Sequence, residues 1–195
     1  MSLSPPFEPV ETIEKAKAGD KDALSRVWLF LNPGLVRYLS SLGCKNSEDL
    51  ASESWISLAK VLPKFQGDIS ALQGLLFQIA RARLYDQWRK TYRSPKAGLR
   101  LIDRSTRIVE ISEMVESALD MSSSKAIEWL SQIPKSQAEV ISLRVIVGLT
   151  YYEISQVIGK SEGAVRILFF RGINNLEKVV TENNLGSGKN FSSSA

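Results

Sequence analysis

Apolar residues recur at intervals of three and four positions along much of this 195-residue chain, which is the spacing of one face of an α-helix. In the first half, Pro and Gly residues mark the expected helix ends. The expected helices are residues 10–18, 21–31 with a continuation to 41 after Asn32-Pro33-Gly34, 47–62 with Ser47 as N-cap, and 69–92. No segment shows a convincing alternation of apolar and polar residues, so the sequence predicts an all-α fold.

A second helical region is expected over residues 123–180, where helix starts carry local capping signals. Ser136 with Glu139, and Thr150 with Glu153, fit the S/T-x-x-E capping box. In that motif the two side chains satisfy backbone amides that the first helical turn leaves without partners. The pattern therefore predicts helices that begin just after Pro134 and just after Leu149.

The stretch from residue 150 to 176 has the spacing of a helix-turn-helix. Such a unit needs a small residue where the helices touch, then a turn glycine, then a branched apolar residue, and Ser155, Gly159 and Val165 stand at these places. Gly159 tolerates the left-handed conformation that ends a helix, and Ser161 can cap the next one. A plain αα-hairpin fits the same spacing, so this pattern alone leaves both interpretations open.

The two helical regions are expected to be separate small domains, residues 1–94 and 123–180, joined by a long flexible linker over residues 95–122. Apolar periodicity is weaker in the linker, and its length exceeds that of routine connections inside a domain. Residues 181–195 are polar and rich in Gly and Ser, so they are expected to form a disordered tail.

Charge is unevenly placed, although the formal net charge is only +4. Nine basic residues and two acidic residues lie between Arg81 and Arg107, and the charged residues that follow, from Glu110 to Asp120, are acidic. A concentrated basic segment favours a polyanion such as nucleic acid as partner. A solvated helix face followed by a charged linker explains the same residues without any partner.

The sequence lacks the groups that most enzymes and metal sites use. It contains no histidine and one cysteine, Cys44, which we interpret as incidental. Gly-rich phosphate loops and nucleophile elbows are absent. We therefore expect a protein that is not an enzyme, with no catalytic residues, cofactor, metal or small-molecule substrate. With no apolar run of membrane-spanning length and no secretory signal, a cytoplasmic location is expected.

A series of short motifs has the order and spacing of a known family. In the first region they are Ala18-Gly19-Asp20, Asp49-Leu50 with Glu53 and Trp55, Phe65-Gln66-Gly67, Leu76-Phe77-Gln78-Ile79-Ala80-Arg81, Asp86 and Arg89-Lys90. In the second they are Ile133-Pro134, Glu139-Val140, Gly148-Leu149-Thr150, Glu153-Ile154, Ser161-Glu162-Gly163 and Val165-Arg166. Together they resemble the compact two-domain bacterial sigma factors of the extracytoplasmic-function group.

The resemblance implies a promoter-specificity subunit that binds core RNA polymerase, recognises the −10 and −35 promoter elements and assists promoter melting. Its partners would be core polymerase, promoter DNA as duplex and opened strand, and an anti-sigma protein. The implied core-polymerase contacts are Asp49, Ser52, Glu53 and Trp55. The implied −10 contacts are Phe65, Gln66, Asp68, Ser70, Arg81, Arg83, Trp88, Arg89 and Lys90. The implied −35 contacts are Lys160, Ser161, Glu162, Ala164, Arg166 and Arg171. For Trp55 and Trp88, an inward position in the domain core is the alternative.

The chain departs from the family pattern at positions that bear on specificity. Ala82 stands where the family has an Asn that often reads a −10 base, and Ala164 replaces the usual Thr. Residues 167–170 are more apolar than the polar, basic run of the family, and Phe169 or Phe170 is expected to pack on an inhibitor or on the core. Promoter specificity therefore cannot be copied from the family.

A stand-alone helix-turn-helix regulator is the alternative function. It would bind duplex DNA unaided, usually as a dimer, whereas a sigma factor should bind promoter DNA poorly without core polymerase. The long linker and the apolar recognition helix also suggest a further hypothesis. In this hypothesis the two domains of the free protein pack together and hide both DNA surfaces.

Overall fold

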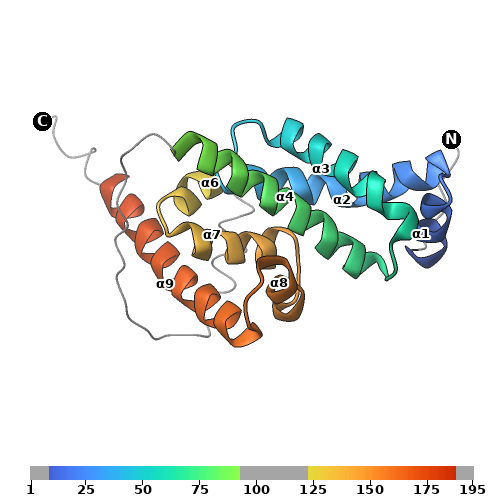
Figure 1. Cartoon of the computed structure of the whole chain (residues 1–195). Helices are drawn as coiled ribbons and strands as arrows, with labels where there is room; N and C mark the ends of the chain where they lie inside the picture. Colours follow the sequence, from blue (N-terminus) through green and yellow to red (C-terminus); the bar gives the residue numbers. More distant parts are fainter. Residues whose placement is uncertain (1–8, 93–122, 188–195) are drawn as a thin grey trace, which may run out of the picture.

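The computed structural model describes residues 9–92 and 123–187, and both stretches are helical (Figure 1). The first region consists of α1 (Pro9–Lys17), α2 (Lys21–Ser41), α3 (Ser47–Val61), the 3₁₀ turn η1 (Leu62–Lys64) and α4 (Ile69–Tyr92). The second consists of α6 (Ser123–Ser131), α7 (Lys135–Ile141), the π-helical turn η2 (Ser142–Ile146), α8 (Tyr151–Ile158) and α9 (Glu162–Ser187). The described residues contain no strand, which confirms the all-α class, and the predicted linker lies outside them.

The expected break in the second helix is wrong, because α2 continues through Pro33. Proline removes one helical hydrogen bond and costs about 3 kcal/mol in a helix interior. Buried residues keep helical spacing on both sides of it, from Val27 and Leu31 to Leu35 and Tyr38, each at most 2% exposed. Burial of a large apolar side chain contributes about 1.5–3 kcal/mol, so this face outweighs the proline.

Two predicted helix caps are also wrong. Asn46, not Ser47, occupies the N-cap position of α3, and the hydroxyl of Ser47 accepts a hydrogen bond from Ser40 instead. Helix α7 begins just after Pro134 as expected, but without a side-chain cap. Glu139, assigned by its spacing to a capping box, points away from the helix start and bonds to the first region.

The second predicted capping box is confirmed. Thr150 accepts from the backbone amide of Glu153, and the Glu153 carboxylate accepts from the amide of Thr150 at 2.7 Å. Gly159 ends α8 with φ +68°, a conformation that favours glycine. The hydroxyl of Ser161 then accepts from the amide of Ala164 at 3.3 Å, as expected for the cap of α9.

Helix α9 is longer than the sequence suggests and crosses α7 closely. It extends to Ser187, so the tail predicted for residues 181–195 begins as helix, and residues 188–195 lie outside the described range. A Cβ atom at Gly172 would lie 2.9 Å from Ile141 and 3.1 Å from Gln137 on α7. Glycine therefore permits this crossing of the two helices.

The two regions pack against each other. Helix α8 packs on α4, and η2 and α6 pack on α2, so that α1 and α9 lie at opposite ends of the molecule (Figure 1). One set of mutually packed buried residues spans both regions, from Ile13 on α1 to Leu176 on α9. This arrangement agrees with the hypothesis that the two regions of the free protein pack together.

Candidate nucleic-acid and partner interfaces

The outer face of α3 carries the residues expected to bind core polymerase. Asp49, Ser52 and Glu53 are exposed on it. Trp55 turns inward instead and donates its indole N–H to Asn32 on α2 at 3.0 Å. The apolar residue exposed on this face is Ile56, at 59%. The motif directed attention to the aromatic residue, although Ile56 lies one turn from Glu53 and two turns from Asp49 on the same face.

Arg83 belongs to this α3 surface rather than to the face of α4 that meets the second region. Its guanidinium donates to the Glu53 carboxylate and to the Ser57 hydroxyl, each at 2.6 Å. The implied −10 contact at Arg83 and the implied polymerase contact at Glu53 are therefore paired with each other. Because both side chains are substantially exposed, water screens the pair, and separating them is inexpensive.

The loop before α4 is built around Gly67 and Asp68. Gly67 has φ +143°, and a Cβ atom there would lie 2.8 Å from Ala71. Asp68 accepts from the backbone amide of Ala71 at 2.9 Å, so one of its oxygens is used at the start of α4. Gln66 is exposed and Phe65 is half-buried, which leaves Gln66 the freer of the two to meet a ligand.

Four residues of α4 form a single stripe that faces the second region: Gln78, Arg81, Tyr85 and Trp88. Their spacing of three or four positions places them on one side of the helix. Gln78 donates to the carbonyl of Gln156 at 3.0 Å. Trp88 lies under the ammonium group of Lys135, 3.7 Å from its ring centroid. Two of the implied −10 residues, Arg81 and Trp88, are thus in contact with the second region.

The centre of this contact is the carboxylate of Glu139, which is only 3% exposed. It accepts hydrogen bonds from the Tyr38 hydroxyl at 3.1 Å, from Arg81 Nε at 2.8 Å and from the Tyr85 hydroxyl at 3.0 Å. Burial and the neighbouring Glu139 carboxylate raise the pKa of Tyr85 to about 12 and that of Tyr38 well above its usual value. Burial alone would lower the pKa of Arg81, but the charge of Glu139 raises it overall. Both tyrosines therefore stay protonated as donors.

Further polar contacts surround this centre. The hydroxyl of Ser41 donates to that of Ser142 at 2.7 Å. Beside the loop, burial would raise the pKa of Glu153, but hydrogen bonds from Thr150 and Ser70 lower it overall. Ser70, an implied −10 residue, thus also meets the second region. The hypothesis of hidden DNA surfaces therefore fits part of the −10 set.

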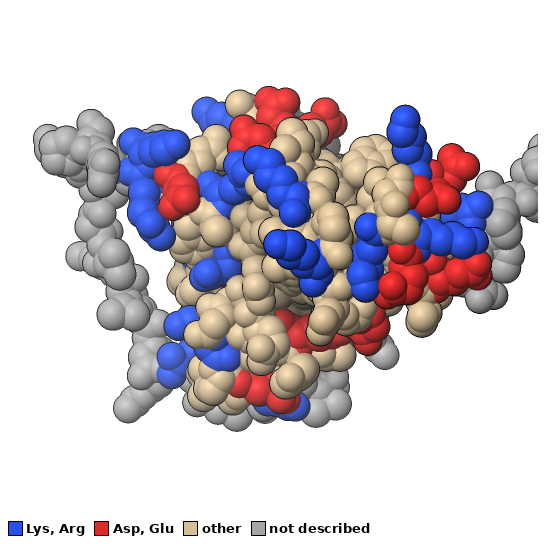
Figure 2. Space-filling view, turned by 45° about the vertical axis from the view of Figure 1, so that its right-hand side comes forward, with Lys and Arg blue, Asp and Glu red and all other residues tan. Residues whose placement is uncertain are grey.

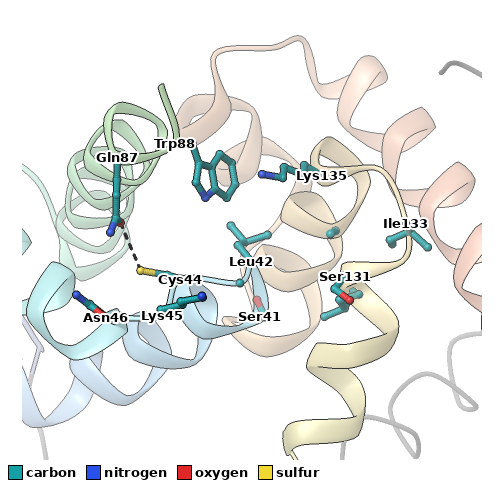
Figure 3. A pocket seen from close by; sticks show the side chains of 13 residues that line it. Ser41, Leu42, Cys44, Lys45, Asn46, Gln87, Trp88, Ser131, Ile133 and Lys135 are labelled. Atoms are coloured by element: carbon teal, nitrogen blue, oxygen red, sulfur yellow. Dashed lines mark hydrogen bonds between the residues drawn. The ribbon is translucent and has the colours of Figure 1, made fainter. Parts of the chain in front are cut away.

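A cavity of about 520 Å³ opens where α2, α4, α6 and α7 meet. Figure 3 shows Cys44 and Gln87 on one side of it, with Trp88 and Lys135 on another. Cys44 is buried, its thiol lies 3.7 Å from the Gln87 side-chain oxygen, and burial raises its pKa. The wall contributed by the second region includes Leu130, Ser131, Ile133, Lys135 and Ala138. Cys44 thus lies at the seam between the two regions.

The last described turn of α4 remains exposed. Arg89 and Lys90 both face solvent, and the 3.3 Å pair between Arg89 and Asp86 is too exposed to hold either side chain firmly. Figure 2 shows basic side chains distributed among acidic and uncharged ones on the face that it presents. Arg89 and Lys90 are therefore accessible to nucleic acid in the conformation described.

The start of α9 is also exposed, and the packing of the two regions does not cover it. Lys160, Ser161 and Arg166 are exposed, Glu162 and Ala164 are half-buried, and Arg171 is exposed. Arg166 donates to Glu162 at 2.6 Å and lies 4.7 Å over the ring of Tyr151. These contacts hold its guanidinium near the first turn of α9. The hypothesis that both DNA surfaces are hidden is therefore wrong for this face, as far as the described residues go.

The apolar run after Arg166 divides between the interior and the surface. Phe169 packs edge-on against Tyr151 with centroids 5.7 Å apart, and against Phe170 at 5.9 Å. Ile167 instead points outward and is 53% exposed, one turn from Gly163. Phe169 is therefore engaged within the second region, and Ile167 is the apolar residue that the sequence-based list missed.

The described helices include none that is long and apolar enough to cross a membrane. Within residues 9–92 and 123–187, no group of three or more His, Cys, Asp or Glu side chains could hold a metal ion.

Comparison with protein families gives two matches in the expected order. The family model for Sigma-70 region 2 matches residues 32–94, and that for Sigma-70 region 4 matches residues 125–176. The chain is 28% identical to the ECF RNA polymerase sigma factor ShbA of Streptomyces griseus, over 87% of this chain and 94% of ShbA. It is 24% identical to the ECF RNA polymerase sigma factor BldN of Streptomyces coelicolor, over 89% of this chain and 66% of BldN.

Solved structures show the same fold at low sequence identity. CnrH, solved in complex with the cytosolic domain of CnrY, superposes with a TM-score of 0.64 at 17% identity, covering 88% of this chain and 96% of CnrH. RpoE of Bartonella quintana, solved with the anti-sigma factor NepR, gives a TM-score of 0.60 at 18% identity, covering 81% and 96% of the two chains.

Proposed function

The chain belongs to the extracytoplasmic-function RNA polymerase sigma factors, and from that premise we propose how its surfaces divide the work of promoter recognition. Sigma factors bind core RNA polymerase and promoter DNA, and they are initiation factors rather than enzymes. A stand-alone helix-turn-helix regulator is not favoured, because region 2 and region 4 matches occur together in one chain. We further propose that it works with polymerase in the cytoplasm.

Core polymerase is proposed to bind the outer face of α3. Ile56 would serve as the apolar centre of that interface, with Asp49, Ser52 and Glu53 around it as a polar rim, the arrangement typical of specific protein interfaces. Trp55 would act indirectly by fixing α3 to α2 through its bond to Asn32. Ile56 is 59% exposed beside these polar side chains, which supports its role as the apolar centre.

The −10 element is proposed to bind along α4 and the loop before it. Arg89 and Lys90 would attract the phosphate backbone from the exposed end of the helix. Trp88 could stack on an unpaired base once Lys135 leaves its face, since base stacking on aromatic side chains is a usual means of holding opened strands. Gln66 and Ser70 would line the loop side, and Phe65 and Asp68 would support the loop.

The −35 element is proposed to bind the exposed start of α9. Helix-turn-helix proteins place the N-terminal residues of the recognition helix against base edges in the major groove. Lys160 and Arg171 would approach phosphates, and Arg166 would reach a base once it leaves Glu162. Ile167 would contact a thymine methyl group, the apolar feature of the major groove. We therefore expect a thymine within the −35 element opposite Ile167.

An anti-sigma protein is proposed as a further partner. RpoE of Bartonella quintana was solved with such a protein, and our chain shares its fold. Three apolar residues of α2 are exposed, namely Trp28, Leu29 and Phe30, and they would suit a helix of that partner.

The family matches carry the proposal, and run-off transcription tests it. Purified core polymerase should make new defined transcripts from host DNA only when this chain is added. Replacing Ile56 with Asp should abolish those transcripts and the binding of core. Val10→Asp is the matched control, because Val10 is an exposed apolar residue on α1. If Ile56→Asp retains core binding, the proposed α3 interface is wrong, whereas transcripts that never appear refute the sigma function itself.

A further inference from the structure

Promoter recognition does not by itself explain why three donors of the first region converge on one carboxylate of the second. Tyr38 comes from α2, Arg81 and Tyr85 come from α4, and all three hydrogen-bond to Glu139 within 3.1 Å. The described residues contain no buried side-chain polar atom without a partner, so this arrangement is fully satisfied. The three donors thus form an anion-binding site of the first region, and the anion that occupies it is the Glu139 carboxylate of the same chain.

Resting on the proposed function, we propose that Tyr38, Arg81 and Tyr85 form a phosphate-binding site for the opened −10 strand. In the closed chain Glu139 occupies that site, and a DNA phosphate replaces it when the two regions separate.

The donors are held in place by contacts within the first region, so the site should persist when Glu139 departs. The guanidinium of Arg81 lies over the ring of Tyr85, 4.5 Å from its centroid. Tyr38 packs edge-on against Phe77 with centroids 5.2 Å apart, and Phe77 is fully buried. None of these contacts involves the second region.

The donor set suits a phosphate as well as a carboxylate. Both ligands are anions whose oxygens accept several hydrogen bonds, and a guanidinium with two hydroxyl groups offers charge and direction to either. Arg81, Tyr85 and Trp88 follow one another along the same side of α4. A phosphate bound at the first two would therefore bring a neighbouring base toward Trp88, the residue proposed to stack.

Glu139 and DNA cannot use the site together. The carboxylate is almost wholly enclosed, and the same contact places Lys135 over the Trp88 ring and Gln156 against Gln78. Any strand that reaches Arg81 must first displace the second region. The carboxylate thus acts as an internal competitor of DNA.

The test measures binding of fluorescent single-stranded oligothymidylate to the full chain without polymerase. Glu139→Gln should bind about 30- to 100-fold more tightly than wild type, because the substitution weakens the hydrogen bonds through which Glu139 competes with DNA, by about 2–3 kcal/mol in total. Adding Arg81→Gln to that variant should abolish the gain in affinity. It should also reduce the slope of log binding constant against log salt concentration by about 0.7 in magnitude, the value for one single-strand phosphate contact. Glu177→Gln, an exposed charge removal on α9, is the matched control and should bind as wild type does.

Two results would overturn the proposal: Glu139→Gln binding no tighter than the control, or a gain that survives Arg81→Gln. A second measurement uses the wild-type chain, so that it does not depend on the folding of a variant. Saturating oligothymidylate should accelerate maleimide labelling of Cys44, the single cysteine, because bound DNA holds the seam open. An unchanged labelling rate at saturation also refutes it. Run-off transcription by wild-type holoenzyme remains independent of both measurements, so failure of the sigma function is recognised separately.

Discussion

Replacing Glu139 with Gln should shift the free chain toward separated regions. The two oxygens of the Glu139 carboxylate accept hydrogen bonds from Tyr38, Arg81 and Tyr85, whereas a glutamine side chain has only one acceptor oxygen. At least one of these three donors therefore loses its acceptor. A buried hydroxyl such as that of Tyr38 costs about 1–3 kcal/mol when left unsatisfied, and hydrogen bonds to charged groups contribute about 1.5–3 kcal/mol. Loss of the charge facing Arg81 acts in the same direction. We expect the closed state to lose about 2–3 kcal/mol in total.

The rate at which a bulky maleimide labels Cys44 measures this shift. Cys44 is 8% exposed, lines the cavity between the regions and has a raised pKa because of burial, so it should react slowly in the closed chain. When closing is fast relative to labelling, the rate follows the population of the open form. Since 1.4 kcal/mol corresponds to a factor of ten, Glu139→Gln should label about 30- to 100-fold faster.

The Glu177→Gln chain should label at the wild-type rate under the same conditions. Labelling of Glu139→Gln within about twofold of that control would mean that the carboxylate contributes no more than a neutral surface residue. The reasoning from its three bonds would then be refuted, whatever the DNA measurements show.

Three further predictions concern the helices and the tyrosines. Gly172→Ala would place a Cβ 2.9 Å from α7 and should lose about 1–2 kcal/mol of unfolding free energy, whereas Gly74→Ala meets nothing within 4 Å and should gain about 0.5–1 kcal/mol. Urea unfolding followed by circular dichroism measures both, and the reverse order contradicts the proposed crossing. Thr150→Ala should lose about 1 kcal/mol in the same assay, and an unchanged midpoint would show that the capping box contributes nothing. Finally, Tyr85 should deprotonate near pH 12 rather than near 10 in an ultraviolet titration. The contribution of Tyr85 to the stability of the closed state is therefore complete below about pH 10 and is lost as the pH rises toward 12. Glu139→Gln should lower that apparent pKa, and an identical titration curve would contradict the bond.

Local rules predicted most helices because they depend on neighbours in sequence. The capping box at Thr150, the stop at Gly159 and the turn before Ile69 all follow from residues a few positions apart. The break at Pro33 was a failure of the same rules, since burial of the α2 face through tertiary packing outweighs the local cost.

The sequence could not assign Glu139 correctly because its partners lie far away in the chain. Its spacing after Ser136 fits a capping box, yet the carboxylate bonds to Tyr38, 101 positions earlier. One usable signal was present. Polar and aromatic residues at Arg81 and Tyr85 share a helix face with Trp88, which indicates a face that meets something other than an apolar core.

The residue-level assignments to polymerase and DNA stay predictions, although the structure sorts the residues by accessibility. Exposed side chains missed by motif reasoning, Ile56 and Ile167, occupy positions where the family resemblance drew attention to their neighbours. A family resemblance locates the motifs along the sequence. Which side chains near each motif are exposed depends on how the helix is rotated about its axis in the folded protein.

The pairing of Arg81 with Glu139 has a consequence for where the free protein is found in a cell. A genome offers on the order of 10⁶–10⁹ non-specific sites, and each attracts exposed cations through release of counterions. When Arg81 is paired with Glu139 and Lys135 covers Trp88, the chain has fewer side chains available to bind those sites. We therefore expect the closed chain to bind non-specific DNA more weakly than a chain whose two regions are apart, with Arg89, Lys90 and the start of α9 still accessible.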